Sequence, residues 1–426
     1  MTTLIVGGGW SGLAAAIACV QRGEPVHLIE SAKQLGGRAR NVSWNGHIID
    51  NGQHLMIGAY DRMLAMMMSI GVDTDSVFQR QAMDIVIYDT EYPALKLSSK
   101  SFLPWPLSLA WNLASSAGLS GLKQVAILQS SIENTLKSKD ISVSEWLLSK
   151  KQSKRLIKQL WEPLCLATLN TPIKEASAHL LAIVLRDSLG KGKPAADLLI
   201  PRQPLGDLFP RIAAKYIQQH GSKVSLATRV KSLIVEQQKV TGLVLGDGTQ
   251  IEANTIIVAT NLSKSNQLLS SYIHYHLPAE YPICTVYLQY GAETRLAAPM
   301  LGMSGTISQW IFDRSEQTPG LMAVVISAPG EHEKMAKEAL ISLVCKEIHQ
   351  LFPAMPEQVE QGFVIREKRA TFACTVGIEQ QRPQHQTDIA GLWLAGDYVA
   401  NNYPATLEGA IRNGENCAKL MVADLK

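Results

Sequence analysis

The chain opens with short apolar runs separated by glycine-containing turns. Residues 2–6 form an apolar run that predicts a strand, residues 7–12 a glycine-rich turn, and residues 13–20 an alanine-rich stretch that predicts a helix. A second apolar run, residues 26–29, predicts another strand that ends at Glu30. Strands that alternate with helices in this way indicate a parallel sheet in an α/β fold.

Similar patterns return in two later parts of the chain. We expect a helix from residue 205 to about 220, strands at 223–226, 230–235 and 239–245 with a turn at 246–249, and a buried parallel strand at 255–260. A strand at 392–395 and a helix at about 405–425 follow near the end. We therefore predict a Rossmann-like domain built from residues 1–68, 205–265 and 373–426.

The two intervening stretches predict a second, α+β domain made of residues 69–204 and 266–372. Residues 99–204 are predicted to be mainly helical, with apolar positions three and four residues apart in 126–136 and 155–169. In residues 266–372 we expect strands at 284–289, 321–327 and 362–366 and one helix at 331–351.

The first turn carries the glycine spacing of a dinucleotide-binding site. Gly7, Gly9 and Gly12 match G-x-G-x-x-G between a predicted strand and a helix. Gly7 allows the tight turn, Gly9 a close approach of the pyrophosphate, and Gly12 helix–strand packing. We expect Ser11 and the free N–H groups of the helix start to face the phosphates. Glu30 is placed to accept hydrogen bonds from the adenosine ribose, and its charge disfavours a 2′-phosphate there.

The nature of the dinucleotide is indicated by the Leu-Gly-Gly-Arg run at residues 35–38. This run resembles the second fingerprint of the superfamily of flavin-dependent amine oxidases and carotenoid desaturases. The resemblance implies that Gly37 passes beneath the cofactor and that Arg38 lies by its phosphates, where a guanidinium can bind in a bidentate way. Arg40 is either a second such group or a solvated loop charge.

The last part of the chain resembles the C-terminal flavin motif of the same superfamily. Gly396 would allow close approach, Asp397 would bind a hydroxyl near the ribityl chain, and the helix that begins near Pro404 would point its positive end at the flavin. The resemblance thus implies FAD as the cofactor. It also implies further contacts, for which we take Gly52, Gln53, Val230, Ala259, Ala405 and Thr406.

Composition narrows the function classes. The chain has 426 residues with 40 Lys and Arg against 37 Asp and Glu, so its net charge of +3 does not suggest nucleic-acid binding. The six cysteines show no C-x-x-C pair, which predicts free thiols in a reducing cytoplasm and no metal site. Because the first strand starts at once, we expect no signal peptide.

Residues 101–122 lack charged side chains and contain Trp105 and Trp111. Pro104, Pro106 and two glycines disfavour a membrane-spanning helix. Two interpretations stay open: a segment that dips into the membrane interface, and a helix that lines an internal apolar pocket. We expect the lysines at 137–154 to be solvated.

The substrate is indicated by a narrower resemblance. Residues 161–172 (WEPLCLATLNTP) and 50–54 (DNGQH) resemble the squalene-associated FAD-dependent desaturases, better described as hydroxysqualene dehydroxylases. The alternative interpretation of residues 161–172 is purely structural: a helix with Pro163 near its start and an Asn-Thr-Pro stop.

This resemblance implies the reductive removal of an allylic hydroxyl from a long apolar isoprenoid, in hopanoid synthesis. Such a reaction needs a proton donor, a hydride and a dry pocket. His54 is our first candidate for proton transfer and Asp50 the second, while Tyr398, Tyr403 and Arg186 are not ranked. The protein would work in the cytoplasm, with contact to the inner membrane face and to the enzyme that supplies its substrate as candidate interactions.

Two rival functions remain at this point. A desaturase of squalene or a carotenoid precursor, or an amine oxidase, would share every cofactor motif. A lipid carrier of the GDP-dissociation-inhibitor type would share the architecture without catalysis, but it would have no reason to keep Gly7, Gly9, Gly12, Glu30 and Asp397.

Overall fold

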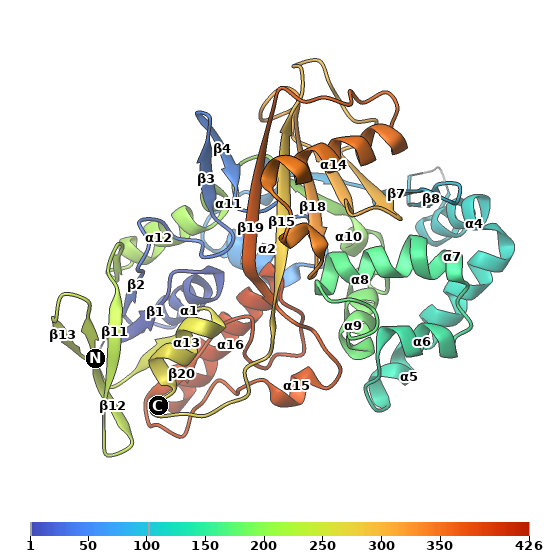
Figure 1. Ribbon diagram of the computed structural model, residues 1–426. Helices are drawn as coiled ribbons and strands as arrows, with labels where there is room; N and C mark the ends of the chain where they lie inside the picture. The colour runs from blue at the N-terminus through green and yellow to red at the C-terminus, as the bar shows by residue number, and fades with distance from the viewer. Residues whose placement is uncertain (1, 101–102, 426) are drawn as a thin grey trace.

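A parallel sheet forms the centre of the first domain. The structure is a computed structural model that describes residues 2–100 and 103–425. Five strands are hydrogen-bonded in the order β10-β2-β1-β14-β20. Their bounds are Lys223–Ser225 for β10, Val26–Ile29 for β2, Thr3–Val6 for β1, Ile256–Val258 for β14 and Leu392–Leu394 for β20. All four pairings are parallel, so the three predicted segments meet in one sheet, as shown at the lower left of Figure 1.

Helices from both ends of the chain pack together on this sheet. α1 (Trp10–Val20) is buried along almost its whole length and lies against α16 (Leu407–Asp424). The two approach closely because Gly414 has no side chain: a Cβ there would lie 2.0 Å from the carbonyl oxygen of Ser11. α12 (Pro210–Gln219), which belongs to the segment 205–265, also packs on α1.

Three small sheets accompany the parallel sheet. The strands predicted at 230–235 and 239–245 are present as β11 (Val230–Glu236) and β12 (Lys239–Leu245), and β13 (Gln250–Glu252) follows the predicted turn in the same sheet. The other two sheets pair β3 (Asn41–Trp44) with β4 (His47–Asp50), and β5 (Met56–Ile57) and β6 (Phe78–Gln81) with β9 (Leu198–Pro201).

A seven-stranded sheet forms the second domain, in the order β19-β15-β18-β17-β16-β7-β8. The bounds are Gln361–Phe372 for β19, Glu280–Gln289 for β15, Leu321–Ser327 for β18, Trp310–Asp313 for β17, Met300–Ser304 for β16, Asp84–Asp89 for β7 and Leu95–Ser98 for β8. β7 pairs with β16, so both inserts contribute to this one sheet. α14 (Lys337–Leu351) covers one face, with Leu340, Val344 and Ile348 in the sheet's core.

The first insert also supplies the helices on the right of Figure 1. They are α4 (Trp105–Ser130), α5 (Ile132–Lys137), α6 (Val143–Ser149), α7 (Lys154–Leu156), a π-helical turn (Ile157–Trp161), α8 (Glu162–Leu169), α9 (Ala178–Leu189) and α10 (Lys193–Ala196). α8 ends at Asn170 in a left-handed conformation, which is the predicted Asn-Thr-Pro stop. Shorter helices elsewhere are α2 (Asp61–Ser69), α3 (Thr74–Val77), α11 (Leu205–Leu208), α13 (Leu262–Leu269) and α15 (Ile378–Gln381).

α4 bears on the interpretation of the charge-free run at residues 101–122, whose first two residues lie outside the described ones. The helix is kinked at Gly118, and Leu107, Trp111 and Leu119 are 57%, 67% and 80% exposed. Within residues 2–100 and 103–425, every helix is too short or too polar to cross a bilayer.

Two predicted helices are interrupted. The helix predicted at 205–220 is split at Phe209, because a proline, Pro210, disfavours the α conformation of the residue before it. The helix predicted at 331–351 was placed too early: Glu331–Glu333 is a separate 3-10 turn, and α14 begins at Lys337. The Arg366 side chain donates to the carbonyls of His332 and Met335 and so holds the chain out of the helix between them.

Candidate functional site

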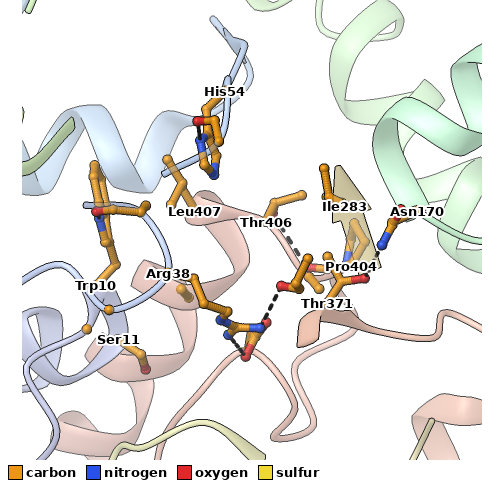
Figure 2. Close-up of a pocket in the computed structure, with 18 of the residues that line it drawn as sticks. Trp10, Ser11, Arg38, His54, Asn170, Ile283, Thr371, Pro404, Thr406 and Leu407 are labelled. Atoms are coloured by element: carbon orange, nitrogen blue, oxygen red, sulfur yellow. Dashed lines mark hydrogen bonds and ion pairs between the residues drawn. The ribbon is translucent and has the colours of Figure 1, made fainter. Parts of the chain in front are cut away.

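One cavity of about 1050 Å³ runs from the carboxyl ends of the parallel strands into the second domain. Its walls come from segments far apart in the sequence. Figure 2 shows Trp10 and Ser11 on one side, Asn170, Ile283 and Thr371 on the other, and Thr406 and Leu407 between them. Ligands of open α/β sheets bind at this end of the strands.

The glycine turn after β1 forms the floor of one end of the cavity. Gly7 has φ +111, and a Cβ on it would lie 2.7 Å from the Ala259 carbonyl oxygen. Gly9 is open toward the cavity, with Gly37 as its nearest neighbour. Gly12 does not line the cavity, and its missing side chain lets α1 pack on the turn, as expected from its place in the motif.

The start of α1 offers unpaired donors to a ligand. Its N-cap residue, Gly9, supplies no side-chain cap, and the first turn contains no acidic residue. Ser11 in that turn lines the cavity, and its buried Oγ has no hydrogen-bond partner within the described residues. An orphaned hydroxyl beside free N–H groups and a positive helix end fits a phosphate group.

Glu30 lies at the end of β2 on the cavity wall. Its Oε2 accepts a hydrogen bond from the Gly8 N–H at 2.7 Å, and its Oε1 accepts one from the Ala32 N–H at 2.7 Å. These bonds fix the carboxylate, and a carboxylate has remaining lone pairs with which to accept bonds from ribose hydroxyls.

Arg38 and Asp397 join the two ends of the chain inside the cavity. Arg38 Nη2 lies 2.6 Å from Asp397 Oδ1, and Arg38 Nη1 donates to the Ala370 carbonyl at 2.7 Å (Figure 2). Gly36 and Gly37, with φ +110 and +60, turn the chain so that it passes next to Gly9. Arg40 also lines the cavity and donates to the carbonyl of Gly37.

The C-terminal segment closes this end with the start of α16. Thr406 is the N-cap, and its Oγ1 accepts a hydrogen bond from the Gly409 N–H at 3.0 Å. Pro404 and Ala405 lie just before it on the cavity wall. The helix therefore points its positive end at the cavity, where it would stabilise negative charge on a bound group.

Most of the residues predicted to bind the cofactor therefore surround this cavity; Gly12 is the exception. Those that line it are Gly7, Gly9, Ser11, Glu30, Gly37, Arg38, Gly52, Gln53, Val230, Ala259, Gly396, Asp397, Pro404, Ala405 and Thr406. Their contacts with a cofactor stay predictions.

His54 lines the cavity as expected, but its environment does not suit an acid. Its Nδ1 donates to the Gly52 carbonyl at 2.7 Å, so Nε2 is the acceptor of the neutral ring. Burial, and secondarily the charge of Arg38, lower the pKa of His54, while the Gly52 bond opposes them. The ring is therefore neutral near pH 7 and can accept a hydrogen bond from a ligand.

Asp50 does not line the cavity, which corrects our second choice for proton transfer. It is buried in the protein, where its Oδ1 accepts the Leu205 N–H at 2.8 Å and its Oδ2 lies 3.9 Å from Arg314. Burial raises the pKa of Asp50 to about 6. The Asp50 side chain thus anchors the first residue of α11 instead of facing the cavity.

Of the unranked candidates, Tyr403 lines the cavity, whereas Tyr398 and Arg186 do not. Sequence reasoning missed Asp187, a buried acid of the cavity wall on α9. It also missed the aromatic residues Tyr60 and Trp310. Nothing local in the sequence marks these three, because only the meeting of distant segments brings them to one cavity.

The other end of the cavity is apolar. Its walls come from the seven-stranded sheet and from α8 and α9, and they include Met83, Ile85, Leu97, Leu164, Ala167, Leu181, Val184, Leu185, Leu198, Ile283, Met300, Phe312 and Val325. α4 contributes none of the described lining residues, so the pocket-lining interpretation of residues 101–122 is not supported.

Comparisons with known proteins agree with this geometry. The chain is 27% identical over 428 residues to a hydroxysqualene dehydroxylase of Zymomonas mobilis, with 99% of each chain covered. It is 23% identical over 479 residues to a zeta-carotene desaturase of Synechocystis, which covers 100% of this chain and 98% of the other. A solved oxidoreductase of Methanosarcina mazei superposes with a TM-score of 0.78 at 16% identity, with both chains covered in full, and shares the fold.

The sequence profile of one family extends over almost the whole chain. It is described as flavin containing amine oxidoreductase, and it matches residues 10–422. This range includes the start of α1, the Arg38 segment and the Asp397 segment, on which the prediction of FAD rested. The chain therefore belongs to the flavin-containing amine oxidoreductase family and is an FAD-dependent oxidoreductase.

Proposed function

We propose that this enzyme reductively removes the allylic hydroxyl of hydroxysqualene to give squalene, in the synthesis of hopanoids or related isoprenoids. The observation that carries the proposal is the cavity itself, in which the dinucleotide-binding end opens directly into the apolar end. Full-length similarity to hydroxysqualene dehydroxylases supports the same substrate.

The apolar end suits a long hydrocarbon because it can hold one without hydrogen bonds. Each Å² of apolar surface removed from water contributes roughly 25 cal/mol, so burial alone can bind a thirty-carbon chain. The same walls exclude water, which would otherwise capture an allylic cation. When bound, reduced FAD supplies a hydride, and an external reductant such as a quinol or a reduced nicotinamide restores it.

The test is a single turnover under anaerobic conditions. Pre-reduced protein is mixed with hydroxysqualene, and squalene and flavin absorbance are followed together. We expect squalene to form in proportion to the flavin that is reoxidised, with squalene in place of hydroxysqualene as the inert control.

Two other results would contradict the proposal. Similarity to carotenoid desaturases makes the opposite direction the second candidate, so the oxidised protein is offered squalene and a carotenoid precursor as well. If only the oxidised protein acts, on these or on an amine, the enzyme is a desaturase or an amine oxidase. If FAD-loaded protein binds hydroxysqualene and never converts it, the protein is a carrier.

We also propose that the enzyme works on the cytoplasmic side of a membrane, in contact with its surface and with the enzyme that makes its substrate. The support is the row of exposed apolar side chains on α4, Leu107, Trp111 and Leu119. A substrate of this kind dissolves in lipid, so an enzyme that rests on the bilayer has a short path to it.

A further inference from the structure

A buried acid and a tyrosine meet in the wall of the cavity, and neither belongs to the cofactor motifs. The hydroxyl of Tyr403 donates to Asp187 Oδ2 at 3.1 Å. Both residues line the cavity, and they are only 7% and 5% exposed. Asp187 lies on α9 beside the apolar residues Val184 and Leu185 of the same wall, and Tyr403 directly precedes Pro404. The pair therefore stands where the apolar end meets the cofactor end.

Asp187 is the carboxylate best placed for the substrate. Among the described residues, the other carboxylates that line the cavity are Glu30, Glu367 and Asp397. Glu30 is held by backbone donors at the dinucleotide end, and Asp397 is paired with Arg38. Glu367 accepts a bond from Asn51, next to the Arg38 segment.

Asp187 is also linked to solvent on its other side. Lys191 Nζ lies 3.5 Å from Asp187 Oδ2, and Arg186 Nε lies 3.1 Å from Asp187 Oδ1. The two cationic side chains are 47% and 44% exposed, and neither lines the cavity. A line of polar groups thus leads from the cavity through Tyr403 and Asp187 to Lys191 and bulk water.

The ring of Tyr403 is held firmly. The Arg412 guanidinium lies 4.7 Å from the ring centroid, and the Tyr403 carbonyl accepts a bond from Arg382 at 2.9 Å. Burial, followed by the charge of Asp187, raises the pKa of Tyr403, so the phenol keeps its proton throughout the working range. Its one proton is donated to Asp187 in this structure and can turn to a substrate oxygen by rotation about the C–O bond, whereas the only N–H of the neutral His54 ring is held by the Gly52 carbonyl.

We propose that Tyr403 protonates the departing hydroxyl of the substrate and that Asp187 and Lys191 return a proton to it from solvent. This inference rests on the proposed function. The allylic carbon–oxygen bond breaks with its electron pair on oxygen, and the phenolic proton passes to that oxygen, which leaves as water. Reduced flavin, when bound, would supply the hydride that the allylic carbon accepts, and the phenolate regains a proton through Asp187 and Lys191. In sum, the alcohol consumes one hydride and one proton and yields the hydrocarbon and water.

Proton transfer from the phenol to the departing oxygen is downhill because hydroxide is a stronger base than a phenolate, even where burial raises the pKa of Tyr403. Asp187 acts through Tyr403 and is a positioning residue. Its negative charge close by would also stabilise an allylic cation in the apolar end of the cavity.

The first experiment compares Tyr403→Phe with the wild type and with Tyr398→Phe as a matched control. Tyr398 is a buried tyrosine whose hydroxyl donates to Ser265 outside the cavity lining. In single turnovers of pre-reduced enzyme, we expect Y403F to form squalene about 10²- to 10⁴-fold more slowly, the usual contribution of a general acid. The wild type should show a solvent deuterium isotope effect that Y403F lacks.

A binding experiment with the oxidised protein gives a second readout that needs no turnover. Wild type should bind hydroxysqualene about threefold to tenfold more tightly than squalene, the effect of one hydrogen bond, and Y403F should bind both equally. Flavin absorbance changes report the binding. Asp187→Asn replaces Y403F in the experiment if Y403F does not fold. This variant should still bind hydroxysqualene more tightly than squalene, but its single turnover should be slower than that of the wild type.

A third substrate separates the proton from the rest of the reaction. An allylic acetate ester of hydroxysqualene releases a carboxylate, which needs no proton to depart, so Y403F should convert it as fast as the wild type does. If the wild type converts hydroxysqualene and Y403F forms squalene from it at the same rate, Tyr403 is not the acid. If the His54→Gln variant loses the solvent isotope effect instead, His54 is the acid. If the wild type itself forms no squalene, the proposed function is wrong. The affinities of wild type and Y403F for hydroxysqualene and squalene then still test whether Tyr403 binds the hydroxyl group.

Discussion

Single side chains at the cofactor end of the cavity are held mainly by backbone groups. The two oxygens of Glu30 accept from the N–H groups of Gly8 and Ala32, and the Thr406 side chain accepts from Gly409. Ser11 Oγ, in contrast, has no partner within the described residues. These bonds fix the shape of the site, and the Ser11 hydroxyl and the remaining lone pairs of Glu30 are left for the ligand.

Glu30→Gln tests the ribose contact. The amide keeps the size of the side chain, but its NH2 group faces an N–H donor of Gly8 or Ala32 and cannot accept. We expect FAD affinity to fall about tenfold, equivalent to roughly 1.4 kcal/mol, as measured by titration of the apoprotein with FAD. Glu236→Gln, at an exposed position of β11, is the control. Equal affinities of wild type and E30Q would contradict a role of this carboxylate in binding.

Glu408 provides a pH test of folding stability. It is fully buried in the first turn of α16, where it accepts the N–H groups of Arg62 and Met63. Burial raises the pKa of Glu408 from 4.5 to about 7, against the opposing effect of Arg412. Between these values the folded protein keeps a proton that the unfolded chain releases, so the free energy of unfolding falls as the pH rises through this window.

We expect Glu408→Gln to lose this dependence. Relative to the variant, the wild type should lose about 3 kcal/mol of stability between pH 4.5 and 7, and no more at higher pH. Urea unfolding at several pH values measures it. Glu415→Gln, on the same helix but partly exposed, should follow the wild-type profile. A parallel course of E408Q and wild type would show that Glu408 does not titrate in this range.

Whole elements were predicted with uneven success, and the reasons are physical. β1, α1, β2, β12 and β18 follow from local pattern, because each is a short apolar run or a clear alternation bounded by turn residues. The breaks at Phe209 and before α14 were missed: the first comes from a proline's effect on its neighbour, and the second from the distant side chain of Arg366. β7, β8, β16 and β17 were not predicted, since their pairing joins two inserts that are far apart in sequence.

The candidate site shows the same division. The residues of the glycine turn and of the Arg38 and Asp397 segments were found because a motif of fixed spacing marks each of them. Asp187 and its contact with Tyr403 could not be found, because this contact joins α9 to a loop near the C-terminus. His54 and Asp50 were chosen from their neighbourhood in sequence alone, and only the structure shows that His54 lines the cavity whereas Asp50 does not.

Asn170 connects the end of α8 to the seven-stranded sheet, and its replacement should destabilise this contact. Its Nδ2 donates to Thr371 Oγ1 at 2.9 Å on β19, and its Oδ1 accepts the Ala328 N–H at 2.6 Å after β18. Asn170→Ala leaves the buried N–H of Ala328 unpaired and puts an alanine in the left-handed conformation of residue 170. We therefore expect the free energy of unfolding to fall by about 2–4 kcal/mol. Urea unfolding measures it.

Asn402→Ala is the control for backbone strain, since Asn402 is also left-handed, with φ 56, but exposed. It should cost about 1 kcal/mol. If N170A costs no more than N402A, the hydrogen bonds of Asn170 do not hold α8 to the sheet.

In the whole molecule, α4 lies across the protein from the β3–β4 hairpin (Figure 1). Inside the cavity, apolar walls are covered by the fold, but Trp111 and Leu119 have no such cover, at 67% and 80% exposure. Scattered apolar residues are normal on a surface, whereas several on one kinked, charge-poor helix favour an interfacial contact.

The double variant Trp111→Glu, Leu119→Glu tests whether this helix meets a bilayer. Burying two such side chains contributes about 1.5–3 kcal/mol each, so their replacement should weaken binding to phosphatidylglycerol–phosphatidylcholine vesicles by at least about tenfold in a flotation assay. Ile48→Glu removes an equally apolar residue, 57% exposed, on the hairpin at the far side, and should bind as the wild type does. FAD content and the unfolding midpoint check that each variant is folded. Equal vesicle binding by the wild type, the α4 double variant and Ile48→Glu would exclude α4 as the contact. If α4 enters the interface, changes on α4 must weaken binding more than a change on the hairpin does.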